Sequence, residues 1–126
     1  MTTTRIEALK GMLSQEPDDA TLHYMLGLEY CKAQMHAEAV ETLRQYLRKA
    51  DDEGAAYRAL AQSLQSLGRL EETRQAYRDG LAAATRHGHQ PMIEEFTQAL
   101  HDLEEPPYAP RYSALSYPCS RLALPV

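Results

Sequence analysis

The feature that most constrains this chain is an internal repeat with a period of 34 residues, seen when residues 20–53 are aligned with residues 54–87. A fixed period of this length indicates a stack of similar units, because one unit buries its apolar face only against its neighbours. The aligned pairs are His23 with Tyr57, Leu26 with Leu60, Gly27 with Ala61, Tyr30 with Leu64, His36 with Leu70, Ala39 with Thr73, Leu43 with Tyr77 and Tyr46 with Gly80.

Each repeat predicts two helices. In its first half, apolar and small residues recur at i, i+3, i+4 and i+7, which places them on one helical face. In its second half, Leu43 and Leu47 belong to a second such stripe, and Leu70, Tyr77 and Leu81 form its counterpart. The small residues Gly27 and Ala61 stand where the two helices of a pair would cross closely.

The predicted helix boundaries agree with this reading. Aspartates at 18–19 and 51–52 precede the first helix of each repeat and are suited to cap it. Gly68 lies between the two helices of the second repeat, where a left-handed residue is expected. Two further amphipathic segments, at about 4–14 and 91–103, predict flanking helices.

Composition favours an all-α fold. Ala, Leu, Glu, Gln and Arg, which are good helix formers, dominate. The β-branched residues that strands prefer are scarce: Val40, Val126, Ile6 and Ile93 are all the Val and Ile there are. A helical bundle without repeats is the alternative, although a bundle needs no fixed period.

The period and the run Leu26-Gly27-Leu28-Glu29-Tyr30 resemble the tetratricopeptide repeat family over about residues 5–104. The resemblance implies a right-handed α-solenoid of antiparallel helix pairs with about six helices, in a domain spanning residues 1–104. An irregular, extended tail would follow at 105–126. The departures from the family pattern are His23 in place of an aromatic residue, Gln34 in place of Gly, and Tyr46 and Gly80 in place of Ala.

The resemblance also implies a function: binding a peptide or helix of a partner protein in a concave groove lined by the first helices. Tyr24 would be an anchor. The carboxylate clamp of some members is not expected, since it needs asparagines and this chain has none. The groove residues implied are Tyr24, Leu28, Cys31 and Lys32 in the first repeat and Arg58, Gln62, Gln65 and Ser66 in the second.

Charge and cysteine content exclude several other classes. The net charge is −5, and all 18 acidic residues lie at or before Glu105, so a nucleic-acid partner is not expected. Cys31 and Cys119 form no disulfide framework. No apolar run approaches the roughly 20 residues that span a bilayer, and the first residues contain no apolar signal core. We therefore expect a cytoplasmic protein without a membrane partner.

The segment after Glu105 holds five of the seven prolines, interleaved with tyrosines. Proline sustains neither a helix nor a central strand, so this segment is predicted to be extended or disordered. A terminus without function is one interpretation. The other is that this cationic tail binds its own groove or that of a second copy, which makes a self-assembling homo-oligomer the alternative function.

No enzyme, cofactor or metal site is predicted. The sequence contains no phosphate-binding glycine loop, HExxH or GxSxG motif. His87 and His89 are close in sequence and His101 follows, but a metal site needs further ligands held in geometry, so a polar loop is the favoured interpretation. Lys32 beside Cys31 could lower the pKa of the thiol, yet no His or Asp at a useful spacing supports a nucleophile.

Overall fold

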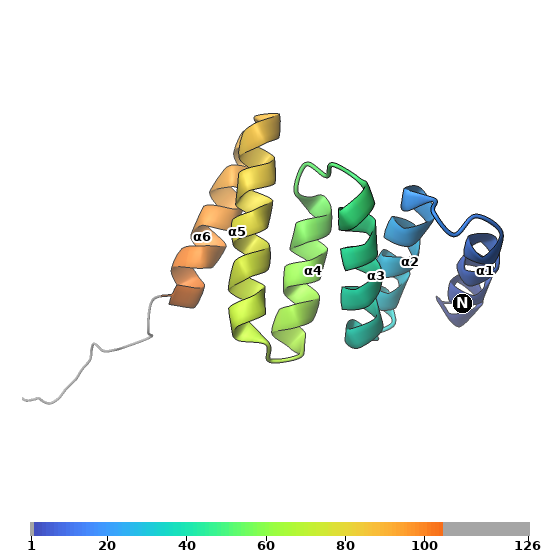
Figure 1. Cartoon of the computed structure of the whole chain (residues 1–126). Coiled ribbons are helices and arrows are strands. Elements are labelled where there is room, and N and C mark those ends of the chain that lie inside the picture. The colour runs from blue at the N-terminus through green and yellow to red at the C-terminus, as the bar shows by residue number, and fades with distance from the viewer. Residues whose placement is uncertain (1, 105–126) are drawn as a thin grey trace, which may run out of the picture. The chain divides into compact units, whose positions relative to one another are not determined.

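The computed structural model describes residues 2–104, and all regular structure within them is helical, which confirms the all-α prediction (Figure 1). The first compact unit ends at Phe96, and the described residues 97–104 belong to a second unit. The predicted tail lies outside the described residues. The helices are α1 (Thr2–Gln15), α2 (Ala20–Lys32), α3 (His36–Lys49), α4 (Ala55–Ser66), α5 (Leu70–His87) and α6 (Gln90–Glu104).

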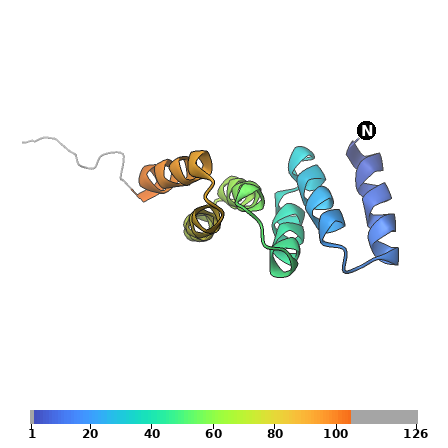
Figure 2. The same ribbon diagram turned by 90° about the horizontal axis from the view of Figure 1, so that it is seen from above.

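Within the first unit, helices that follow one another in the chain pack side by side, from α1 against α2 to α4 against α5 (Figures 1 and 2). Helix α2 also contacts α4 directly, although α3 separates them in sequence. The first helices of the two repeats are therefore neighbours, and their side chains can contribute to a single surface.

The buried residues of the two repeats recur with the 34-residue period. Leu26 and its counterpart Leu60 are each 5% exposed, and both Ala39 and Thr73 are fully buried. Helix α1 continues this register, because Leu9 lies one period before the fully buried Leu43 and is itself 4% exposed. The first flanking helix thus packs as the second helix of a preceding unit would.

The predicted caps are present. Asp19 is the N-cap of α2 and accepts a hydrogen bond from the backbone N–H of Leu22 at 3.1 Å. Asp52 serves α4 by accepting the N–H groups of Gly54 and Ala56 at 2.8 and 2.9 Å. Gly68 adopts the expected left-handed conformation, with φ of 77°.

Two departures from the family pattern have a local explanation. His23 is buried, and its Nδ1 lies 3.0 Å from the carbonyl oxygen of Asp19, so the imidazole finds a polar partner inside the fold. Gln34 has φ of 63°. A side chain other than glycine strains this left-handed conformation, which explains why the family prefers Gly at this turn.

No helix among the described residues is long and apolar enough to cross a membrane.

Candidate protein-binding surface

The eight predicted groove residues lie on the two adjacent helices α2 and α4, and we call the surface they form the α2–α4 face. Tyr24, Leu28 and Cys31 follow one another at i, i+4 and i+7 on α2 and are half-buried. Gln62 and Gln65 on α4 are exposed. Sγ of Cys31 on α2 lies 3.3 Å from Oγ of Ser63 on α4, so the two repeats meet at this face. The eight residues are Tyr24, Leu28, Cys31, Lys32, Arg58, Gln62, Gln65 and Ser66.

Tyr24 is held in place by a polar network behind it. Its ring lies 5.0 Å from that of Tyr46 on α3, at an interplanar angle of 35°. The Tyr46 hydroxyl donates a hydrogen bond to Oδ1 of Asp52 at 3.0 Å. Burial, and then this bond to a carboxylate, raise the pKa of Tyr46 to about 12. Burial, followed by the charge of Asp52, also raises the pKa of Tyr24. Both tyrosines are therefore neutral at physiological pH.

Arg58, one of the two predicted cations of the face, is already paired. Its Nε and Nη2 donate to the two carboxylate oxygens of Glu95 on α6, each at 2.7 Å. This two-point contact raises the pKa of Arg58 and lowers that of Glu95. An acidic partner would have to compete with Glu95 for this guanidinium.

Lys32, the other predicted cation, is paired as well. Its Nζ lies 3.4 Å from Oε2 of Glu29, which also accepts Nε–H of Arg5 at 3.0 Å. Burial raises the pKa of Glu29, but the hydrogen bonds from Arg5 and Lys32 outweigh it and leave that pKa below its ordinary value. The α2–α4 face thus presents little uncompensated charge.

Cys31 contacts Ser63 across the junction of α2 and α4, with Sγ 3.3 Å from Oγ. Cys31 therefore links the two first helices within this face.

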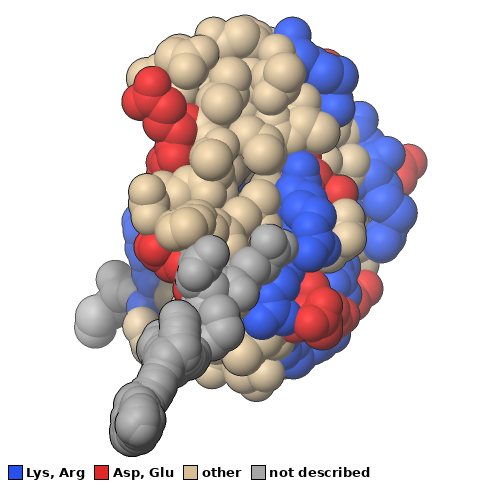
Figure 3. Space-filling model, turned by 90° about the vertical axis from the view of Figure 1, so that its left-hand side faces the viewer, with Lys and Arg blue, Asp and Glu red and all other residues tan. Residues whose placement is uncertain are grey.

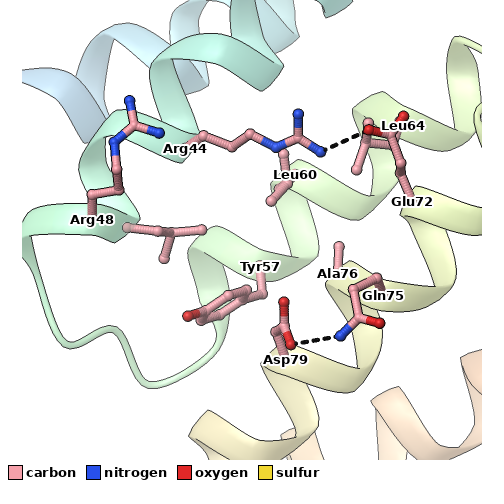
Figure 4. Close-up of a pocket in the computed structure, with 10 residues that line it drawn as sticks. Arg44, Arg48, Tyr57, Leu60, Leu64, Glu72, Gln75, Ala76 and Asp79 are labelled. Carbon is pink, nitrogen blue, oxygen red and sulfur yellow. Dashed lines mark hydrogen bonds and ion pairs between the residues drawn. The ribbon is translucent and has the colours of Figure 1, made fainter.

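A second feature, which sequence reasoning missed, is a cavity of about 300 Å³ between α3 and α5 (Figure 4). Across it, Nη2 of Arg44 on α3 donates to Oε2 of Glu72 on α5 at 3.2 Å, and along α5 Nε2 of Gln75 donates to Oδ1 of Asp79 at 2.9 Å. None of the predicted site residues lines it. The lining residues are Arg44, Leu47, Arg48, Tyr57, Leu60, Leu64, Glu72, Gln75, Ala76 and Asp79.

Comparison with known proteins agrees with this architecture. A family model described as tetratricopeptide repeat matches residues 1–84. The TPR repeat-containing protein PA0015 of Pseudomonas aeruginosa is 33% identical over 99 residues, which cover 79% of this chain and 94% of that protein. The solution structure of protein BPP2914 from Bordetella parapertussis is 32% identical and superposes with a TM-score of 0.67 over 78% of this chain and 85% of that one. The chain belongs to the tetratricopeptide repeat family.

Tetratricopeptide repeat proteins are in general protein–protein interaction modules. The α2–α4 face is formed by the first helices of this tetratricopeptide unit. The α3–α5 cavity is formed largely by the second helices and by the opposite side of α4. The sequence signal for the cavity was the spacing of Arg44 and Arg48 on one helix and of Glu72, Gln75 and Asp79 on the other.

The histidines of the α5–α6 turn do not converge. Nε2 of His87 lies 3.1 Å from Oδ2 of Asp51, and Nη2 of Arg86 lies 3.1 Å from Oδ1 of the same carboxylate. Hydrogen bonds from Arg86 and then His87 lower the pKa of Asp51. Within residues 2–104, no three His, Cys, Asp or Glu side chains are grouped so that they could hold a metal ion.

Charges of both signs lie beside one another on the surface of this tetratricopeptide protein (Figure 3). On α5, Nη1 of Arg74 donates to Oε2 of Glu71 at 2.6 Å. Glu72 accepts hydrogen bonds from both Arg44 and Arg69, which lower its pKa. Because these cations are paired, they do not form the uniform basic patch on which phosphate backbones bind.

Proposed function

We propose that this chain is a protein-binding adaptor or scaffold module whose α2–α4 face holds an extended peptide or a helix of a partner protein. The observation that carries the proposal is the half-buried stripe of Tyr24, Leu28 and Cys31 beside the exposed amides of Gln62 and Gln65. Apolar side chains left partly open next to polar ones are typical of the anchor and rim of a protein-binding site.

The geometry of the face suits a peptide. Tyr24 has lost part of its freedom to the Tyr46 ring behind it, so a partner side chain packing on it meets a pre-organised surface. The amides of Gln62 and Gln65 each offer both donors and an acceptor, which is what the backbone of an extended segment requires.

The partner segment is expected to be largely uncharged where it crosses the face. Arg58 and Lys32 are compensated by Glu95 and Glu29. A segment that relied on carboxylates would gain little, because it would only exchange one ion pair for another.

A steric block at Gln62 tests the proposal. The variant Gln62→Trp adds an indole to an exposed position of the α2–α4 face, and the control Ala82→Trp adds one to an exposed position on α5. Both variants and the wild-type chain are immobilised, and the proteins that each retains from the lysate of the native cell are quantified by mass spectrometry.

A partner that the wild type and Ala82→Trp retain equally, and that Gln62→Trp retains at least tenfold less, supports binding at this face. Identical retention by all three baits contradicts it. Capture of this chain alone, together with a mass that rises with concentration in sedimentation, would instead favour the self-assembling alternative.

A further inference from the structure

The junction of α1 and α2 exposes apolar surface. Met12 on α1 is 52% exposed and Met25 on α2 is 38% exposed. A cavity of about 170 Å³ lies between these helices, lined by Arg5, Ala8, Leu9, Met12 and Met25. A second cavity, of about 530 Å³, continues along the junction and is lined by Gly11, Met12, Gln15, Glu16, Asp19 and Leu22.

The next repeat along the chain shows which element packs on a surface of this kind. One period further along the chain, α3 and α4 stand where α1 and α2 stand, and there the equivalent surface is covered by α2. A Cβ placed on Gly27 of α2 would lie 2.7 Å from Cδ2 of Leu43, so the two helices touch at this point. The ring of Tyr24 packs on that of Tyr46 at 5.0 Å.

One 34-residue period earlier, Leu9 corresponds to Leu43 and Met12 corresponds to Tyr46. Both residues line the smaller cavity, and Met12 also lines the larger one. Leu9 is 4% exposed within the core that α1 shares with α2, whereas Met12 stays 52% exposed, because α2 is the only helix among residues 2–104 that packs on α1. The α1–α2 surface therefore has the residues of a helix-binding surface, but its helix is not among residues 2–104.

The same comparison fixes the direction of the absent helix. Nζ of Lys49, near the end of α3, contacts the carbonyl oxygen of Pro17 and Oδ1 of Asp18, both at 3.3 Å, in the loop that leads into α2. One period earlier, the residue that corresponds to Lys49 is Gln15. A helix on the α1–α2 surface would accordingly begin near Gln15 and end near Arg5.

The charges along the surface agree with that direction. Glu16 and Asp19 line the cavity at the end where the helix would begin, and Arg5, whose Nε also donates to Glu29, lines the cavity at the other end. The N-terminus of a helix carries a partial positive charge and its C-terminus a partial negative one. The α1–α2 surface is therefore complementary to the dipole of a helix lying in this direction.

We propose that the α1–α2 surface is a second binding site, and that it takes an amphipathic helix of a partner protein. That helix lies with its N-terminus towards Glu16 and Asp19, places a small residue over Leu9 and packs larger apolar residues beside Met12 and Met25. The site shares no residue with the α2–α4 face, so the two proposals can be tested independently of each other.

The probe for this site is a capped synthetic peptide with the sequence of residues 17–34, which contains α2, carrying Cys31→Ser to prevent oxidation. It is the segment that covers the equivalent surface one period later. Titration calorimetry with the full chain is expected to show one peptide bound per chain. The variant Met12→Glu is expected to bind it at least tenfold more weakly, whereas Leu70→Glu, at a position that is 45% exposed on α5, is expected to bind it as the wild type does.

A second peptide controls for non-specific association. This peptide carries Gly27→Leu, which places a side chain where the glycine would approach Leu9. The second peptide is expected to bind at least tenfold more weakly than the first. Circular dichroism of the Met12→Glu chain checks that its helices persist, as the exposure of Met12 predicts.

Equal binding of the first peptide to the wild type and Met12→Glu would overturn the proposal, as would equal binding of the two peptides. No binding of either peptide, with a wild-type dimer that Met12→Glu dissociates, would overturn it in favour of a second copy of this chain as the occupant.

Discussion

The two repeats fill the same space between their helices in different ways. Positions 46 and 80 align. In the first repeat Tyr46 fills the space with its own ring, which packs on Tyr24 and donates a hydrogen bond to Asp52. In the second repeat Gly80 leaves the space open, and Phe96 of α6 reaches into it, so that a Cβ at Gly80 would lie 2.8 Å from the Phe96 ring.

The difference determines what each repeat offers to a partner. Tyr24 and Arg58 also align. Tyr24 packs on a residue of its own repeat and keeps part of its ring exposed, whereas Arg58 reaches out to Glu95 of α6. The space between the helices of the first repeat is filled by a residue of that repeat, and the space in the second repeat is filled by a residue of α6. The aromatic ring that stays partly exposed on the α2–α4 face therefore belongs to the first repeat.

The largest effect is expected from removing the residue that closes the second repeat. Phe96 is fully buried, and its ring lies 5.6 Å from that of Tyr77. Phe96→Ala is expected to lower the free energy of unfolding by about 3–5 kcal/mol, because it leaves a cavity as well as losing apolar burial. Urea unfolding followed by circular dichroism measures this, with the exposed Glu94→Ala as control. A loss no larger than that of the control would show that α6 does not close the second repeat.

A smaller loss of stability is expected from adding a side chain at Gly80, where Phe96 already fills the space between the helices. Gly80→Ala adds a Cβ 2.8 Å from Cβ of Tyr57, an atom that cannot move without its backbone. We expect a loss of about 2 kcal/mol from overpacking, despite the better helix propensity of alanine. Gly11→Ala is the matched control, since its Cβ would meet nothing within 4 Å. It should gain about 0.5–1 kcal/mol. The comparison fails if the two substitutions change thermal stability in the same direction.

In the first repeat, Tyr46→Phe keeps the ring and removes only the hydrogen bond to Asp52. We expect a loss of about 1 kcal/mol. The pKa of Tyr46 is about 12 in the fold, above its ordinary value of 10.0. The unfolded chain therefore releases this proton first, and the stabilisation is present below pH 10 and lost as pH rises towards 12. The midpoint temperature of thermal unfolding should consequently fall less steeply between these pH values for Tyr46→Phe than for the wild type. An equal pH dependence of the two midpoints would exclude a stabilising role for this hydrogen bond.

The smallest effect is expected at the ion pair between α4 and α6. The side chains of Arg58 and Glu95 are 37% and 42% exposed, so Glu95→Gln is expected to cost about 0.5 kcal/mol. Because the pKa of Glu95 is lowered in the fold, its contribution is present above its ordinary value of 4.5 and lost as pH falls below it. The difference in stability between wild type and variant should thus disappear in acid. The same variant should bind acidic peptides more tightly, since it frees Arg58, and unchanged binding would mean that Arg58 does not take part.

Much of the fold was predictable because it follows from local chemistry repeated at a fixed period. The burial of Leu26 and Leu60, the left-handed Gly68 and the Asp19 cap each follow from residue type and spacing. Gln34 shows where local chemistry fails as a guide, since its residue type did not predict its φ of 63°.

The site was less predictable, because it depends on contacts between residues far apart in sequence. The face itself could be located from the repeat register. That Arg58 would be paired with Glu95, 37 residues away, could not, because α6 follows the repeats and its register against α4 depends on how Phe96 packs. The α3–α5 cavity was missed for a similar reason, since it requires side chains from three helices.

The most direct test of the central claim, that the α2–α4 face binds a partner protein, is site-specific photocrosslinking in the native cell. A benzoylphenylalanine is placed at Gln65 on this face or, as control, at Ala82 on α5, both of which are exposed. The account predicts a crosslinked partner from position 65 that is absent from position 82 and is lost when Gln62→Trp is added. A partner crosslinked from position 82 and not from position 65 would contradict it.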